Sequence, residues 1–232
     1  MQPYTMLNLM EQDTIAHVKL QWPDSGILTQ ELLSDFIKLM DYLEDETACT
    51  LIVFQGLDTQ QPIAQSVAPD IEHCRKWENI LRRIERFTGA SIVGIDGFCT
   101  RFHFQLALAC DYKVATTRSI FQAPEVKEGF LPGMLAFRLA KYIGVGAARR
   151  LLFIGEPCAT AEAIHLGMIE HQCEVADFEQ VISETQQALM PIDPEVLLNT
   201  RRLLNESFAT SYEDAIGHFL AAQNLCLAKT AK

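Results

Sequence analysis

The sequence of 232 residues lacks any apolar run close to the roughly 18 residues that a membrane-spanning helix needs. Its N-terminal stretch carries no positive charge ahead of an apolar segment and no small-residue cleavage site, so the pattern of a secretory signal is absent. These absences exclude a transmembrane protein and predict a chain that works in the reducing cytoplasm. The length and a hydrophobic content of 49% suffice for a sizeable core without covalent cross-links.

Cysteines are present but do not form the pattern of a disulfide framework. There are seven, an odd number, at long intervals and with no CxxC pair, so we expect free, mostly buried thiols. No grouping of His, Cys, Asp and Glu has the spacing of a metal site, and none is predicted.

Positive charge is scarce, with 19 Lys and Arg against 30 Asp and Glu and a net charge of −11. This balance argues against a nucleic-acid surface or an anionic membrane as partner. By segment the net charge is −9 for residues 1–71, +3 for 72–118 and −5 for 119–232. An anionic ligand is therefore expected to use the middle segment.

The first half of the chain has the pattern of a layered α/β domain. Residues 4–9 and 15–20 predict a hairpin, with Ala16, Val18 and Leu20 facing the core and Ile15 facing out. Thr29 is placed to cap a helix, and residues 50–54 form a buried strand. Strand, helix and strand in this order imply a parallel crossover.

Further along, the pattern predicts a loop, an amphipathic helix and a compact set of short elements. Residues 56–70 have no period and form a loop, and residues 71–87 form the helix. A strand over 91–95, an almost uncharged helix over 102–110 and a strand over 112–115 follow.

Short helices over 133–142, 146–153 and 160–166 and an extended piece over 169–175 precede a helical remainder. Its predicted caps are Asp177 with Gln180, Asp193 before Pro194, and Ser211 with Asp214. We therefore divide the chain into an α/β core over 1–175 and a helical C-terminal region over 176–232, and expect the second to pack on a neighbouring subunit.

The motifs of residues 92–144 carry a family resemblance. In order they are Asp96-Gly97, an apolar helix ending in LALACD at 106–111, Pro124-Glu125, and GFLPG at 129–133. Together with residues 148–170, this series resembles the enoyl-CoA hydratase/isomerase, or crotonase, superfamily, most strongly over 91–175. The resemblance implies a crotonase-like spiral of ββα turns with a helical C-terminal oligomerisation region. It also implies assembly as homotrimers or hexamers.

The resemblance further implies action on an acyl thioester. The thioester is carried by coenzyme A or by the phosphopantetheine of a carrier protein, with no tightly bound cofactor. The shared device is an oxyanion hole of two backbone N–H groups that stabilises an enolate. One donor matches Phe102, within Arg101-Phe102-His103, where the family usually has three glycines.

Two glutamates hold water and pass protons in the hydratases of this family, and they match Gln105 and Glu125 here. Glutamine cannot take up a proton, so the resemblance leaves Glu125 as the one general acid/base. Phe121, Ala123, Val126 and Phe130 are expected to desolvate Glu125 and raise its pKa. The alternative is that Glu125, after Pro124, is simply a carboxylate in the first turn of a helix.

Each of the other candidate site residues has two possible interpretations. Arg101 pairs with a phosphate, pantetheine amide or carboxylate of the ligand, or is an ordinary exposed arginine at a helix start. His103 is a core or interface histidine, or an additional site residue. In the loop after Gly56, either residues 63–66 supply the second oxyanion donor, with Ile63 and Ala64 against the cofactor, or that half of the hole is lost.

The segments WENILRRIER (77–86) and SFATSYEDAIGHFLAAQ (207–223) resemble small accessory crotonases of dihydroxyphenylglycine assembly, which act with a type III polyketide synthase and a second crotonase. Three hypotheses follow. The protein is an acyl-thioester dehydratase/hydratase or isomerase of secondary metabolism, a non-catalytic partner of another crotonase or a polyketide synthase, or a carrier-linked decarboxylase or hydrolase.

Overall fold

A six-stranded sheet forms the centre of the computed structural model, which describes residues 4–21, 27–57 and 70–230. Its strand order is β1-β2-β3-β4-β6-β9. β1 and β2 pair antiparallel and every later neighbour pairs parallel, as the predicted hairpin and crossover require. The strands are β1 Leu7–Gln12, β2 Ile15–Leu20, β3 Leu51–Leu57, β4 Ala90–Ile95, β6 Tyr112–Thr116 and β9 His171–Cys173.

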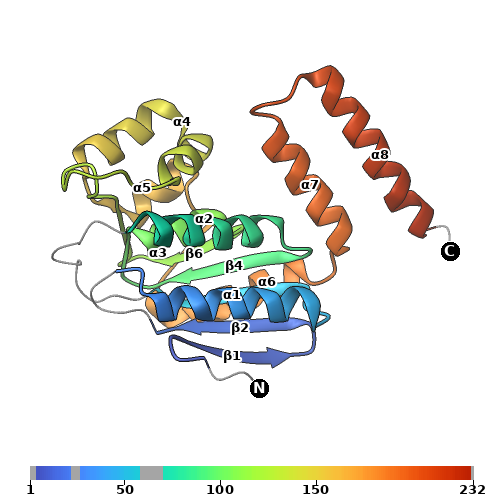
Figure 1. Cartoon of the computed structure of the whole chain (residues 1–232), viewed down its shortest axis with the longest axis horizontal. Coiled ribbons are helices and arrows are strands. Elements are labelled where there is room, and N and C mark those ends of the chain that lie inside the picture. The colour runs from blue at the N-terminus through green and yellow to red at the C-terminus, as the bar shows by residue number, and fades with distance from the viewer. Residues whose placement is uncertain (1–3, 22–26, 58–69, 231–232) are drawn as a thin grey trace.

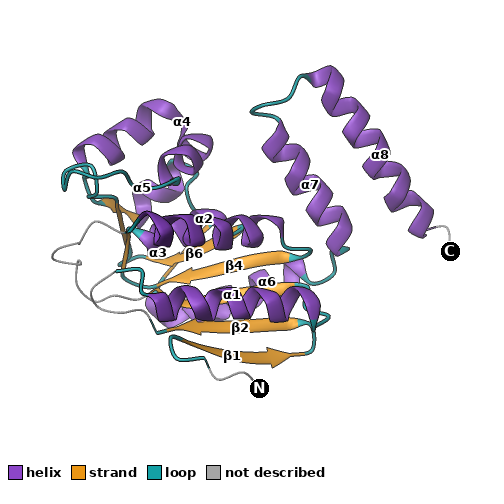
Figure 2. Cartoon of the chain, in the orientation of Figure 1, coloured by secondary structure: helices purple, strands orange, loops and turns teal. Residues whose placement is uncertain are grey.

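Helices cover both faces of this sheet (Figure 2). α1 (Gln30–Asp45), α2 (Ile71–Arg86) and α3 (Phe102–Ala109) bury the larger core on one face, and α6 (Phe178–Leu189) covers the other. The expectation that Ile15 faces outward is wrong, because its side chain packs in the α6-side core and is 8% exposed. Gly94 permits this second layer, since a Cβ there would lie 2.7 Å from the Ile182 side chain.

A second, three-stranded sheet was not foreseen in the sequence. It joins β5 (Phe98–Thr100), β7 (Ile120–Gln122) and β8 (Cys158–Ala159). Strands of two or three residues are too short to show an alternating pattern, which explains why they were missed. β5 leads directly into α3, so this small sheet sets where α3 begins.

The remaining helices are α4 (Leu135–Ile154), α5 (Thr160–His165), α7 (Pro194–Glu206) and α8 (Tyr212–Thr230), with a 3₁₀ turn at Val175–Asp177. The two helices expected over 133–153 meet across a kink at Gly144, whose φ is 74°. The caps at Asp193 and Ser211 are confirmed. The cap at Asp177 is wrong: the 3₁₀ turn places this residue in a helical conformation, and its side chain makes no capping hydrogen bond.

The helices α7 and α8 stand beside the core as an antiparallel pair (Figure 1). Arg201 of α7 anchors them, because its guanidinium binds Asp111 at 2.6 Å and donates to the carbonyls of Phe87 and Gly89. No side chain over 212–228 of α8 is buried, and several large apolar ones are exposed. No helix in the described part of the chain is long and apolar enough to cross a bilayer.

Candidate functional site

The start of α3 is held in an unusual backbone conformation. Arg101, the residue just before the helix, has φ 56° and ψ −121°, a region that glycine occupies readily and other residues at a cost of about 1–3 kcal/mol. The chain thus keeps a glycine-type turn where the sequence has arginine. The same turn places Phe102 as the first residue of α3.

Phe102 lies at the positive end of α3. Arg101 makes no side-chain cap to the first turn, and the N–H groups there carry the positive end of the helix dipole. The Phe102 ring is half-buried and stands edge-on to Trp77 of α2 at 6.1 Å. The ring packing therefore fixes the first turn of α3 against α2.

Residues 124–133 form a tight turn that faces α3. The Phe130 N–H donates to the Glu125 carbonyl at 3.1 Å, and the Glu128 N–H donates to the same oxygen at 3.0 Å. Residues 125–129 are a turn rather than a helix, so the interpretation of Glu125 as a first-turn helix carboxylate is wrong. Glu125 is therefore carried by a hydrogen-bonded turn.

The side chain of Gln105 links α3 to the C-terminal part of this turn. Its side chain is 2% exposed, and its Nε2 donates to the Pro132 carbonyl at 3.2 Å. Gly133 leaves room for it, since a Cβ at this position, whose φ is 55°, would lie 3.1 Å from the Gln105 Oε1. The three predicted catalytic residues thus lie on two segments, α3 and the 124–133 turn, that are hydrogen-bonded to each other.

The Glu125 carboxyl is buried and its pKa is shifted. Glu125 is 3% exposed, and its Oε2 has no hydrogen-bond partner among the described residues. Burial raises the pKa of Glu125, while a hydrogen bond to its own backbone and the charge of Arg101 lower it and the charge of Glu128 raises it. The raised pKa agrees with the prediction, and Phe121 and Ala123 nearby are buried as expected.

Two details of the expected surroundings differ. Val126 is 39% exposed, so it does not form part of an enclosed shell around Glu125. Arg101 is not an exposed arginine at a helix start: its side chain is 3% exposed and binds both oxygens of Glu128, at 2.7 and 2.5 Å.

His103 lies fully in the core beneath this site. Burial lowers its pKa to about 3, against the opposing effect of a hydrogen bond with the Phe98 backbone. The side chain is therefore a neutral core histidine at ordinary pH. The predicted ligand contacts Ile63 and Ala64, and the whole of 63–66, lie outside the described residues.

One buried charged cluster was missed at the sequence level. Lys113 of β6 is fully buried, lies 3.2 Å from Glu170 and stacks its ammonium over the Tyr142 ring at 4.4 Å. Its position in an otherwise apolar strand was the available signal. The cluster ties β6 to α4 at the far end of α3 from Phe102.

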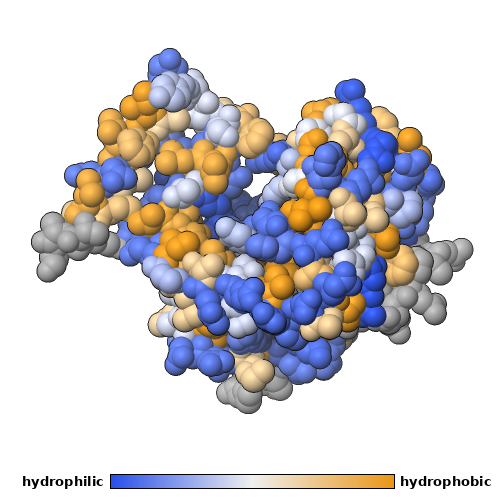
Figure 3. Space-filling view, turned by 180° about the vertical axis from the view of Figure 1, so that it is seen from behind, coloured by the Kyte–Doolittle hydropathy of each residue, from blue (hydrophilic) through white to orange (hydrophobic). Residues whose placement is uncertain are grey.

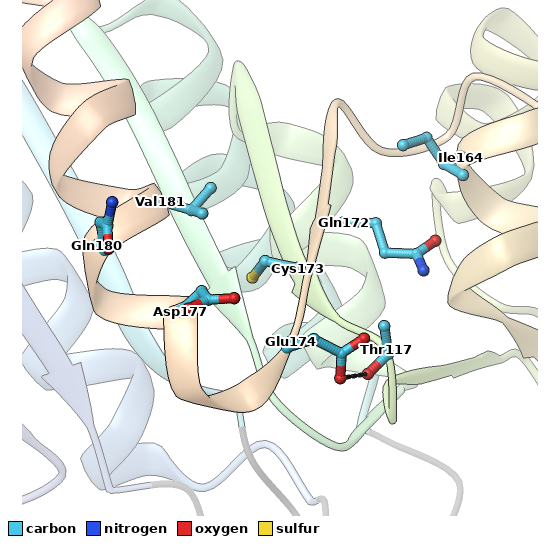
Figure 4. Close-up of a pocket in the computed structure, with 8 residues that line it drawn as sticks. All are labelled: Thr117, Ile164, Gln172, Cys173, Glu174, Asp177, Gln180 and Val181. Carbon is cyan, nitrogen blue, oxygen red and sulfur yellow. Dashed lines mark hydrogen bonds between the residues drawn. The ribbon is translucent and has the colours of Figure 1, made fainter.

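Two hollows of the described structure have no lining residue at Glu125. One of about 680 Å³ lies between β9 and α6, lined by polar groups such as Glu174 and Asp177 (Figure 4). Another of about 780 Å³ runs between α2, α4 and α7, in the region where the back view shows a hollow (Figure 3). Neither contains a predicted site residue, so we place the candidate site by its chemistry rather than by cavity size. Within the described residues no cluster of His, Cys, Asp and Glu is arranged to hold a metal ion.

Comparison with known proteins shows the family of this chain. A family model for enoyl-CoA hydratase/isomerase matches residues 10–231. An enoyl-CoA hydratase of Amycolatopsis orientalis is 28% identical over 67% of this chain and 71% of its own length. A short-chain enoyl-CoA hydratase of Clostridium acetobutylicum is 22% identical over 80% and 76%.

Solved structures show the same fold. A Thermobifida fusca protein assigned to the enoyl-CoA hydratases, crystallised with acetoacetyl-CoA, aligns with a TM-score of 0.84 at 18% identity, covering 97% of this chain and 95% of its own. The Bacillus anthracis enoyl-CoA hydratase aligns at 0.83 and 16% identity, covering 95% and 90%.

Proposed function

This chain belongs to the enoyl-CoA hydratase/isomerase family, and from that premise we propose that it converts an acyl-CoA thioester by hydration, dehydration or isomerisation through an enolate held in an oxyanion hole. The observation that carries the proposal is Glu125, a buried carboxyl with a raised pKa and an oxygen that no described residue binds. A desolvated acid of this kind suits proton transfer near neutral pH.

The proposed roles follow from the two facing segments. The Phe102 N–H, at the positive end of α3, donates to the thioester oxygen as negative charge develops there. Glu125 takes a proton from the carbon next to the carbonyl. It then returns a proton, either to the departing oxygen in dehydration or to another carbon in isomerisation.

A single carboxyl can serve both proton transfers, since it is regenerated at the end. Gln105 cannot exchange protons, and its hydrogen bond to Pro132 holds the turn that carries Glu125, so we assign it an orienting role. Isomerisation needs no second carboxyl and no bound water, and is the reaction that this pair of residues suits most directly.

The test is turnover of short-chain enoyl-CoA thioesters by Glu125→Gln. Loss of a general acid/base should lower kcat by about 10²–10⁴-fold with folding intact. The matched control is Glu44→Gln, which removes an exposed carboxylate of α1 that pairs with Arg83 of α2. Unchanged turnover in Glu125→Gln would refute the assignment.

A second candidate function is a non-catalytic partner of another crotonase or a polyketide synthase. Two features favour it: glutamine stands at the position of the first glutamate, and Arg101-Phe102-His103 stands where the family usually has glycines. This function requires co-purification with the partner enzyme, no turnover by the chain alone, and an unchanged stimulating effect in Glu125→Gln.

The finer assignments are also proposals. The resemblance to the accessory proteins of dihydroxyphenylglycine assembly supports a place in secondary metabolism in the cytoplasm, with the acyl group on coenzyme A or a carrier protein. The uncovered apolar side chains of α8 support the proposal that the helical region over 176–232 assembles the α/β core over 1–175 into homotrimers or hexamers through its last helices, since α6 packs on the core of its own chain. We propose Arg101, Ile63 and Ala64 as the residues nearest the coenzyme.

A further inference from the structure

Arg101 brings a permanent positive charge into the buried space beside Glu125. Its guanidinium cannot lose its proton under ordinary conditions, and its side chain is 3% exposed. A buried charge of this kind is stable only when it is paired. Both oxygens of Glu128 supply that pairing, at 2.7 and 2.5 Å, in the fork geometry that arginine favours.

Glu125 and Glu128 lie in the same turn, three residues apart, and the Glu128 N–H closes it on the Glu125 carbonyl. Two carboxyls therefore stand within the field of one guanidinium. Among the described residues, Arg101 and Glu128 are the charged groups that act on Glu125, and they act with opposite sign. His103 of α3 is neutral.

We propose that Glu128 is a positioning residue that binds the Arg101 guanidinium and so keeps it from pairing with Glu125, leaving the Glu125 carboxyl free for proton transfer. The inference deepens the proposed function and rests on it for its role in catalysis. It also explains how a buried arginine is tolerated beside the reacting acid, because the guanidinium is buried together with its counter-charge, Glu128.

The test is the titration of Glu125 by carbon NMR of protein labelled at the glutamate carboxyls, with Glu125→Gln to assign the resonance. In Glu128→Gln the unpaired guanidinium turns to Glu125, and the titration moves to lower pH. In Arg101→Gln the remaining Glu128 charge acts alone, and the titration moves to higher pH. The double variant should titrate between the two.

These opposite shifts separate the proposal from a merely structural role, which would move both single variants in the same direction. Glu44→Gln breaks a similar bidentate pair with Arg83 away from the site and should leave the Glu125 titration unchanged. An unchanged or upward shift in Glu128→Gln would overturn the proposal. Where that variant fails to fold, Arg101→Gln and the double variant decide, and a shift of Arg101→Gln to lower pH overturns it equally.

The acid limb of the pH–rate profile should follow the same directions in each variant. If the wild-type protein turns over no acyl-CoA thioester, the proposed function fails while the NMR shifts still decide the role of Glu128. If turnover depends on Glu125 but Glu128→Gln leaves the titration in place, the function stands and this inference fails.

Discussion

The buried imidazole of His103 makes the stability of this protein depend on pH in a way that one substitution removes. In the unfolded chain the pKa of this group returns to its ordinary value of 6.5, whereas burial lowers the pKa in the folded protein to about 3. Between these values the unfolded state binds a proton that the folded state does not. The contribution of neutral His103 to the unfolding free energy is therefore fully present above pH 6.5 and is lost as the pH falls toward 3.

The size of the effect follows from the two pKa values. From pH 7 to pH 5 the unfolded state gains most of one proton, while folded His103 gains almost none. The difference in bound protons between the two states, integrated over this pH interval, is about 1.4. At 1.36 kcal/mol per unit, His103 should cost the wild-type protein about 2 kcal/mol of unfolding free energy over that interval.

The assay compares wild type with His103→Asn by urea denaturation at pH 7 and pH 5. Asparagine keeps an N–H donor near the Phe98 backbone but does not titrate. The variant has its own constant cost from lost packing, so the informative quantity is the difference between the two pH values. His165→Asn, at an exposed position, is the control. If wild type and His103→Asn lose the same stability between pH 7 and pH 5, His103 is not held neutral in the core.

Three further outcomes are expected. Burial raises the pKa of Glu125 above its ordinary 4.5, so the ionised carboxylate destabilises the folded state at neutral pH. Glu125→Gln should therefore raise the melting temperature at pH 7 and leave it unchanged near pH 4. A lower melting temperature at pH 7 would contradict this. Arg201→Gln leaves Asp111 with its hydrogen bonds from Ser91 but without its ion-pair partner, and should cost about 3 kcal/mol, with early cleavage before α7 in limited proteolysis. Gly133→Ala places a Cβ against the Gln105 side chain at a residue with positive φ. It should lower the unfolding free energy by about 1–3 kcal/mol and also lower kcat, and a kcat equal to that of the wild type would disprove this.

Local chemistry in the sequence was enough to predict most elements of the central sheet and its helices. Thr29 and Asp193 accept hydrogen bonds from the first turns of their helices, as their residue types and positions indicated. Asp177 has the same residue type but fails as a cap, because the 3₁₀ turn before it was not visible in a one-dimensional pattern. Caps are thus predictable where the preceding backbone is extended.

The residues of the candidate site could be proposed from the sequence, but the contacts between their side chains could not. The resemblance placed Gln105 and Glu125, and the structure brings their two segments together through Pro132. The ion pair between Arg101 and Glu128 joins residues 27 positions apart, and no spacing rule connects them. Ile15 was misassigned for a related reason: alternation assumes one solvent-facing side, whereas α6 covers that side.

The exposed state of α8 bears on what a spectrum of this protein will show. A helix of 19 residues without a buried side chain over 212–228 relies on α7 and on its own hydrogen bonds, whereas most helical stability in proteins comes from the tertiary packing of an apolar face. Its helicity therefore increases when another molecule, such as a second copy of this chain, binds its apolar side chains. The increase depends on the concentration of that molecule and on its affinity. Far-ultraviolet circular dichroism per residue should rise with protein concentration, and the added signal should disappear when the chain is shortened before Tyr212.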